Sequence, residues 1–388
     1  MTQNIDLNNL DKSTWETFKF EDIAEKISKT VKPDEAKVDI YIGLEHIDAN
    51  DIHIRRQGVP ADVKGGKLRC FPGDVIFGKR RAYQRKAAIV TFDGICSAHA
   101  FVFRTNEEII DPKLFIFFLH SDQFMHRMVD ISVGGLSPTI NWGDLKQQEF
   151  LLPPKDQQAK LAELLWAMDE VIERENQFLE NIELLKKVEL KKAFKSKDKE
   201  VNLLNLKEVC KITSGGTAPQ GDEFFLDGTF PFVRMQHLNN LEGDKYPTNY
   251  DYVNSKAVEE KRLKKIEKGS ILLAKSGESI RSEKKAILKI DSYVVNHLAI
   301  LNEYKSFVKK DYLFYFFQDF KLSSLISQTT TPSISLSDLG RIKIPIYKIE
   351  KQEFYIDRFK HLDSSKSAIK SKISSSKALQ KSLINQVF

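Results

Sequence analysis

Two stretches of this chain carry apolar residues in alternating steps of four and three. In the first stretch these residues share one face of a helix, and they are Leu161, Leu165, Met168, Ile172, Leu179 and Ile182. The second stretch continues the pattern near the end of the chain, at Phe359, Leu362, Ile369, Ile373 and Leu383. Such spacing is typical of helices that pair along a narrow seam. It predicts two long helices, at residues 156–199 and 349–388.

A helix with one apolar stripe cannot bury that stripe alone, so the two helices are expected to bury each other. Both would leave equivalent domains in the same direction, and a pseudo-two-fold arrangement would then make the pair antiparallel. The alternative is that each helix packs back on its own globular domain. The narrow stripe and the charged opposite face favour the antiparallel coiled coil.

The remaining segments, residues 1–155 and 200–348, have a different pattern. Short apolar or alternating runs such as 38–42 and 88–92 are separated by glycines and predict strands. A helix is predicted at 112–119 and at 310–317. We therefore expect an α+β protein in which two similar domains of mixed α and β structure are separated by the two long helices.

The two halves of the chain also repeat one another in sequence. Ser137–Leu145 reads SPTINWGDL, and Thr331–Leu339 reads TPSISLSDL. Each copy is followed by a short strand-like run and by a helix that begins near a glutamine, Gln158 or Gln352. A repeat of about half of 388 residues is far longer than the unit of a solenoid. It indicates two copies of one module that consists of a domain and a helix.

Composition narrows the classes of protein. The net charge of +6 and the isoelectric point of about 8.9 favour a polyanionic partner. Three cysteines with no CxxC pair predict reduced thiols in the cytoplasm, with no structural metal. No apolar run is long enough to predict a membrane span, and the first residues do not have the pattern of a signal peptide.

We find no catalytic motif in the sequence. A GxxxxGK[ST] phosphate loop, a [DN]PP[YF] motif and a glycine-rich adenosylmethionine loop are all missing from it. The repeat duplicates four histidines beside apolar residues, and we expect them to be structural: His46, His99, His237 and His297. The chain is therefore predicted to be non-catalytic.

Basic residues cluster at equivalent places in the two halves. Residues 59–92 contain eight lysines and arginines against two acids, and residues 261–285 contain nine against three. Loops of this kind can enter a major groove, where arginine pairs with guanine and lysine holds phosphates. The predicted DNA contacts are Lys64, Lys67, Arg69, Lys79, Arg80, Arg81, Tyr83, Arg85, Lys261, Lys265, Lys275, Ser276, Arg281 and Lys284. Because the two loops differ in sequence, we expect them to read an asymmetric site in two parts.

These features together resemble the specificity subunit of type I restriction–modification systems. The resemblance rests on the domain–helix repeat and on short phrases at residues 73–76, 144–158 and 338–352. It implies two target-recognition domains on an antiparallel spacer, which read a bipartite site in double-stranded DNA. It also implies two adenine methyltransferase partners and two restriction or translocase partners. Adenosylmethionine, ATP and Mg²⁺ would then be bound by those partners only.

Two other functions remain open at this point. The chain could be a protein-only adaptor of a truncated modification system. It could also be a stand-alone nuclease or methyltransferase with duplicated domains, which the missing motifs disfavour.

Overall fold

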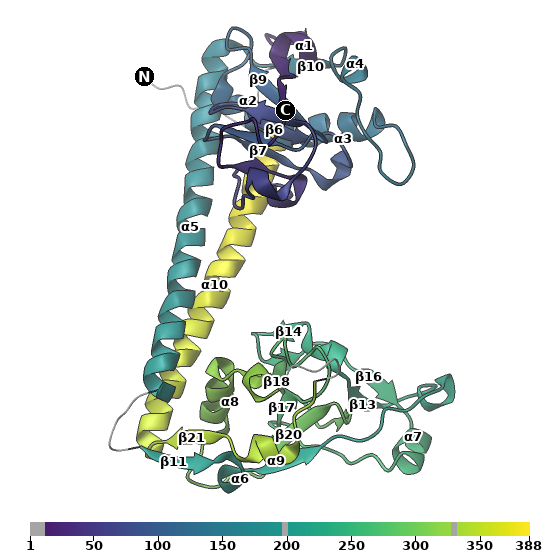
Figure 1. The fold of residues 1–388 in the computed structure, drawn as a ribbon, viewed down its shortest axis with the longest axis vertical. Coiled ribbons are helices and arrows are strands. Elements are labelled where there is room, and N and C mark those ends of the chain that lie inside the picture. The colour runs from purple at the N-terminus through teal and green to yellow at the C-terminus, as the bar shows by residue number, and fades with distance from the viewer. Residues whose placement is uncertain (1–11, 196–200, 327–331) are drawn as a thin grey trace. The chain divides into compact units, whose positions relative to one another are not determined.

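The structure, a computed structural model, describes residues 12–195, 201–326 and 332–388. The chain divides into two compact units, Met1–Asn176 with Lys372–Phe388 (unit 1) and Gln177–Ser371 (unit 2). Each unit combines a domain of mixed α and β structure with one end of each long helix (Figure 1). The predicted α+β fold with two similar domains and two long helices is confirmed.

The domain of unit 1 is built from short strands and helices. Its strands are β1 (Glu16–Lys19), β2 (Ala24–Ile27), β3 (Thr30–Val31), β4 (Tyr41–Ile42), β5 (Lys67–Cys70), β6 (Val75–Gly78), β7 (Ala87–Ile89), β8 (Gly94–Cys96), β9 (Ala100–Thr105) and β10 (Glu149–Leu152). Its helices are α1 (Phe20–Ile23), α2 (Pro112–His120), α3 (Asp122–Asp130) and α4 (Trp142–Leu145). The helix predicted at 112–119 is therefore present as α2.

The domain of unit 2 has a similar order of elements. Its strands are β11 (Asn202–Asn205), β12 (Lys211–Ser214), β13 (Phe230–Val233), β14 (Leu241–Glu242), β15 (Tyr246–Pro247), β16 (Asp251–Val253), β17 (Ile271–Ala274), β18 (Lys285–Ile287), β19 (Tyr293–Val294), β20 (Leu298–Asn302) and β21 (Lys343–Ile346). Its helices are α6 (Leu206–Val209), α7 (Ser255–Glu260), α8 (Lys310–Asp319) and α9 (Leu336–Gly340). The helix predicted at 310–317 is present as α8.

The two long helices are α5 (Lys155–Lys195) and α10 (Ile349–Val387). The expected end of the first helix at 199 and the expected start of the second domain at 200 lie outside the described residues. The boundaries at 155 and 348 fall at the starts of α5 and α10 and stay predictions as domain borders.

The main sheet has the same strand order in both domains. It runs β2-β9-β6-β7 in unit 1 and β12-β20-β17-β18 in unit 2, with antiparallel neighbours throughout. A second sheet also recurs, and in both units it contains one parallel pair, β4 with β8 and β13 with β19. The hairpin that joins β6 to β7 is thus the structural counterpart of the hairpin that joins β17 to β18.

A buried glutamine fastens the start of each long helix to its own domain. The Gln158 side chain accepts a hydrogen bond from the Asp111 amide (2.7 Å) and donates to the carbonyls of Ile109 (2.9 Å) and Pro153 (2.8 Å). Gln352 repeats all three bonds with Lys309, Phe307 and Tyr347. Both side chains are almost fully buried. Each satisfies backbone groups that would otherwise be unpaired in the interior.

A second anchor joins each domain to the helices through an aspartate. Asp169 of α5, which is buried, accepts a hydrogen bond from His53 Nε2 at 2.8 Å. Asp363 of α10, 194 residues later, binds Lys245 at 3.1 Å and the Tyr315 hydroxyl at 2.9 Å. His53 precedes β5 and Lys245 follows β14, so a loop of each domain supplies the partner.

The helices run antiparallel within each unit. In unit 1, Glu175 pairs with Lys372 (3.2 Å), while the earlier Asp169 meets the later Gln380 (3.5 Å). In unit 2, Glu189 pairs with Arg358 at 2.7 Å. The start of each helix joins the core of its own domain, as in the alternative arrangement, but the end of each helix joins the core of the other domain. Of the predicted seam, Leu161, Leu165, Ile172, Ile182 and Phe359 are buried, and Met168, Leu179, Leu362, Ile369, Ile373 and Leu383 are partly buried.

We predict that Gln158→Leu lowers the free energy of unfolding by on the order of 3 kcal/mol, because one amide and two carbonyls lose their partner. Denaturant titration followed by circular dichroism measures the loss. The matched control is Gln157→Leu, at a neighbouring position that is only partly buried. Equal stability of the two variants would contradict the assigned role of Gln158.

The aspartate anchor should depend on pH in unit 1. Hydrogen bonding to Asp169 raises the pKa of His53. A raised folded-state pKa means that the ion pair stabilises fully below about pH 6.5 and less as pH rises through the folded value. The stability of the wild type relative to His53→Gln should therefore fall between pH 6 and 9, as measured by denaturant titration. The His53→Lys variant, which mimics Lys245, is the control. Its stability relative to His53→Gln should stay constant over this range, because lysine remains charged.

Candidate nucleic-acid interface

The loop between β6 and β7 forms a rigid projection on unit 1. Arg81 and Arg85 adopt left-handed backbone conformations (φ 57° and 53°) on either side of a 3-10 turn. Ala82 within this turn is buried, and the Gly78 amide bonds the Lys86 carbonyl at 2.9 Å. The folded loop leaves the side chains of Arg80, Arg81 and Tyr83 exposed.

The repeated Ser/Thr-Pro-x-Ile phrase holds this loop in place. The Arg81 amide donates to the Pro138 carbonyl (2.7 Å), and the Ile140 amide donates to the Lys79 carbonyl (3.0 Å). The Arg81 guanidinium also donates to the Ser137 hydroxyl at 3.0 Å. The phrase found in the sequence therefore supports the β6–β7 loop.

Unit 2 repeats this support with different side chains. Here the Gly277 amide donates to the Pro332 carbonyl and the Ile334 amide to the Lys275 carbonyl, both at 2.8 Å. Ser276 and Gly277 stand where unit 1 has Arg80 and Arg81. The two loops thus share one backbone framework and present unlike chemistry to a ligand.

Two of the predicted DNA contacts are held inside the domain. Arg69 pairs with Asp93 and donates to the Ala36 carbonyl at 2.7 Å. Arg85 pairs with Asp122 (2.7 Å) and donates to the His120 carbonyl (2.9 Å). These contacts favour a structural role for both arginines in place of the predicted DNA contact.

The other predicted residues are spread over the surface of their units. Lys64 and Lys67 lie just before and at the start of β5, in the second sheet of unit 1. Lys261 and Lys265 follow α7, and Lys265 pairs with Asp291 at 3.0 Å. The β6–β7 and β17–β18 loops contain Lys79, Lys275, Arg281 and Lys284. Burial and the neighbouring Lys26 lower the pKa of Lys79. Arg281 is exposed beside Glu278 (3.2 Å). No comparison tests these contacts, and they stay predictions.

The four histidines that the repeat duplicates have two different environments. His46 and His237 are structural as predicted, since each ring accepts a hydrogen bond from a backbone amide at 3.0 Å. His99 and His297 are exposed, and the structural role expected for them stays a prediction. His297 shares a 2.6 Å hydrogen bond with Ser276 of the β17–β18 loop. Their repetition before β9 and β20 was the one sequence signal for them.

Leu136 is an unexpected group. It is 95% exposed at the tip of a turn that is closed by two hydrogen bonds between Val133 and Thr139. This turn continues into the phrase that supports Arg81. An exposed leucine can contact a thymine methyl or wedge between bases. Gly134 and Gly135 before an apolar residue are the signal that could have indicated it.

The described residues contain no group of three His, Cys, Asp or Glu side chains that could hold a metal ion. Within the same residues, no helix is long and apolar enough to cross a membrane.

Comparison with known proteins adds the family. The family described as the type I restriction modification DNA specificity domain matches residues 12–184 and 198–376. Two of the similar proteins come from Methanocaldococcus jannaschii. The type I restriction enzyme MjaIX specificity subunit is 29% identical over 58% of this chain and 56% of its own length. The putative MjaX specificity subunit is 24% identical over 90% and 87%, respectively.

Solved structures support the fold. A chain from a structure of the assembly and conformational transition of the type I R-M system is 20% identical and has a TM-score of 0.65, with 96% of this chain and 97% of that chain covered. The S subunit of a type I restriction-modification system from M. genitalium is 15% identical over 98% of both chains, with a TM-score of 0.55.

These findings define a DNA-recognition protein with two copies of one specificity domain. The chain belongs to the family of the type I restriction modification DNA specificity domain.

The two kinds of arginine in the basic loop should respond differently to alanine. Arg81→Ala should weaken DNA binding by about 1–3 kcal/mol if its contact is a bidentate one to guanine, and leave the unfolding temperature unchanged. Arg85→Ala should lower the unfolding temperature, because the partly buried Asp122 and the His120 carbonyl lose a partner. Fluorescence anisotropy and thermal unfolding measure the two effects. Loss of stability in Arg81→Ala would reassign that residue to the scaffold.

Proposed function

We propose that this chain is the DNA-reading subunit of a type I restriction–modification enzyme. Each domain would read one part of an asymmetric, two-part site in double-stranded DNA. The observation that carries this proposal is the pair of equivalent loops, which have the same backbone hydrogen bonds and different side chains. Equal loops would suit a palindrome, whereas unequal loops suit two different half-sites.

The proposed partners supply the chemistry. Two adenine methyltransferase subunits would receive one adenine from each half-site and flip it out of the duplex. Two restriction or translocase subunits would complete the enzyme. Adenosylmethionine, ATP and Mg²⁺ would be bound by these partners, while this chain binds and orients DNA without catalysing a step.

We propose that the protein is located in the cytoplasm. Its ligand would be chromosomal DNA, and Cys70, Cys96 and Cys210 are buried free thiols in the structure. Burial raises the pKa of Cys210 to about 12, so that its thiol is protonated and unreactive at neutral pH.

The proposal has two rivals from other classes. A stand-alone enzyme would methylate or cut DNA when the purified chain alone is given adenosylmethionine or Mg²⁺. A protein-only adaptor would show no affinity for duplex DNA at any salt concentration. Either result would replace the proposed function.

We also propose that α5 and α10 set the gap between the half-sites. Inserting seven residues after Asn176 and seven after Ser371 keeps the seam in phase and lengthens each helix by about 10 Å. This length corresponds to about three base pairs. Because three base pairs are a fraction of one DNA turn, the second domain would face a different side of the duplex, and binding should weaken. Inserting 21 residues at both places adds about 32 Å, close to one DNA turn.

The longer insertion should therefore restore binding, with both half-sites unchanged and the gap longer by about nine or ten base pairs. Selection from a library of duplexes with random sequence measures the preferred gap. An unchanged gap at full affinity would mean that the helices are not the ruler.

A further inference from the structure

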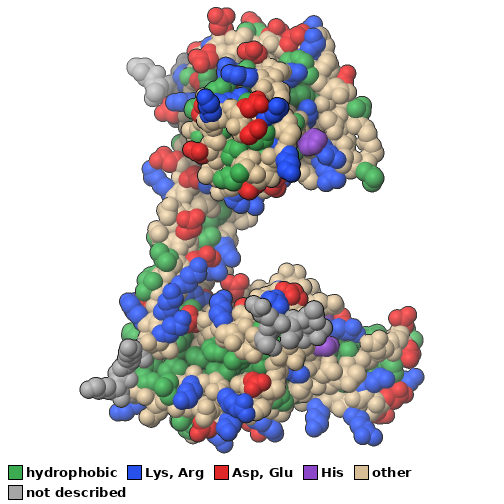
Figure 2. Space-filling model, in the orientation of Figure 1, with side chains coloured by type: hydrophobic (Ala, Val, Ile, Leu, Met, Phe, Trp, Pro, Cys, Tyr) green, Lys and Arg blue, Asp and Glu red, His purple; other side chains and the backbone are tan. Residues whose placement is uncertain are grey.

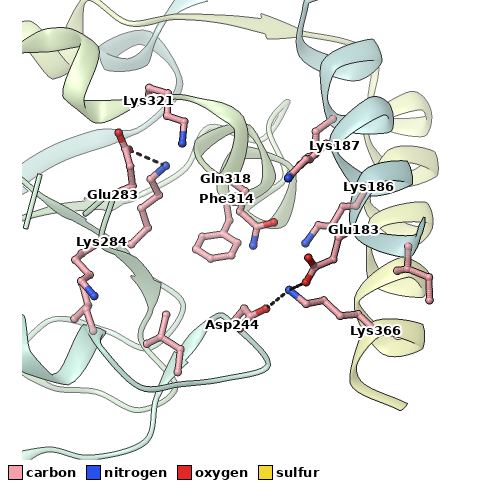
Figure 3. Close-up of a pocket in the computed structure, with 15 residues that line it drawn as sticks. Glu183, Lys186, Lys187, Asp244, Glu283, Lys284, Phe314, Gln318, Lys321 and Lys366 are labelled. Carbon is pink, nitrogen blue, oxygen red and sulfur yellow. Dashed lines mark hydrogen bonds and ion pairs between the residues drawn. The ribbon is translucent and has the colours of Figure 1, made fainter. Parts of the chain in front are cut away.

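A cavity of roughly 400 Å³ in unit 2 lies between the helix pair and the domain (Figure 3). Its floor is apolar and includes Phe314 and Leu190. Residues from α5, from the end of the β17–β18 loop and from the segment after α8 form its walls. Its basic lining residues are six lysines: Lys186, Lys187, Lys284, Lys285, Lys321 and Lys366.

Four carboxylates pair with three of these lysines, and one of the four, Asp363, pairs with Lys186 as well as with Lys245. Glu183 and Asp244 both pair with the same residue, Lys366, at 3.1 Å. Glu283 pairs with Lys285 at 3.3 Å and accepts three further hydrogen bonds from Leu322 and Ser323. Burial lowers the pKa of Lys186 and of Lys285, and neighbouring lysines lower both further. The cavity thus concentrates positive charge at some electrostatic cost.

Three lysines have no ion pair among the residues that the structure describes: Lys187, Lys284 and Lys321. In Figure 3, Lys186 and Lys187 extend from α5 towards Phe314 and Gln318, and Lys321 extends towards the same space from the opposite side. Figure 2 shows lysine and arginine side chains gathered where the helices meet this domain.

At the same corner of unit 1, one carboxylate is shared by two basic side chains. Lys381 of α10 is the counterpart of Lys187, 194 residues apart, and it pairs with Asp122 at 3.5 Å. Asp122 also pairs with Arg85 and follows α2. In unit 2, Asp319 at the end of α8 pairs with Lys195 at 3.6 Å, and Phe320 and Lys321 follow it. Lys187 of unit 2 thus has no ion pair among the described residues, whereas its counterpart Lys381 has one.

We propose that this cavity is a phosphate-binding site, and that its ligand is the DNA backbone beside the half-site read by the second domain. Lys284 lies at the end of the β17–β18 loop and also lines the cavity, so a duplex bound on that loop would bring its backbone towards the cavity. Lysine ammonium groups bind phosphates as point charges, without reading bases. The site would add affinity on one side of the recognition sequence. This inference rests on the proposed function.

The test uses the full chain and a duplex that carries its two-part site. Replacing Lys187, Lys284 and Lys321 with alanine should lower the slope of log K against log salt by about two to three, because each lost phosphate contact contributes about 0.9. The matched control replaces Lys207, Lys343 and Lys348, three exposed lysines of unit 2 outside the cavity, and should leave the slope unchanged. Thermal unfolding checks that both variants are folded.

A second variant, Lys321→Asp, imports the carboxylate that unit 1 has at this corner. It should weaken DNA binding more than Lys321→Ala does, with the base preference kept. Equal salt slopes for the wild type and the triple variant would overturn the proposal.

A free phosphate compound is the other source of the same chemistry. Calorimetric titration with inorganic phosphate and with ATP distinguishes it. The wild type could bind phosphate or ATP and the triple variant could lose that binding, while both have the same salt slope for DNA. This result would overturn the assignment to the DNA backbone. If the wild type itself shows no sequence preference, the proposed function falls and this inference falls with it. If the wild type shows sequence preference and the triple variant has the same salt slope, the proposed function stands, but the cavity is not a phosphate site.

Discussion

The attachment of each domain to the helices is the constraint on which the rest of the structure depends. Gln158 and Gln352 bind three backbone groups each, and Asp169 and Asp363 bind a side chain from a domain loop. These polar contacts are directional and largely buried, so they define one orientation of a domain on its helices. Apolar packing alone would define that orientation less sharply.

The same repeat conserves the scaffold and varies the surface. The Pro138 and Pro332 carbonyls hold equivalent loops, yet one loop presents arginines and the other serine and glycine. At the corner beside α5 and α10, Lys381 of unit 1 pairs with Asp122, whereas its counterpart Lys187 in unit 2 has no ion pair among the described residues. Duplication thus supplied one mechanical module twice, and the differences between copies lie where a DNA ligand would distinguish them.

The elements with a local signal were predictable from the sequence. Steps of four and three indicate helices because the helix period places those residues on one face. The loops were predictable because glycines and polar residues separate short apolar or alternating runs that are typical of strands. The role of Arg85 was not, because its partners Asp122 and the His120 carbonyl come from a distant segment. The lysine cavity likewise needs five separate segments, and exposed Leu136 depends on a turn that closes on Thr139.

The central claim is that two unlike domains, each fixed to a common helix pair, read two half-sites at a set distance. Single-molecule methylation sequencing of DNA modified by this chain with its methyltransferase tests that claim most directly. We expect two different short motifs, each with one methylated adenine, separated by a single invariant gap. One contiguous motif, or the two motifs at variable gaps, would contradict it.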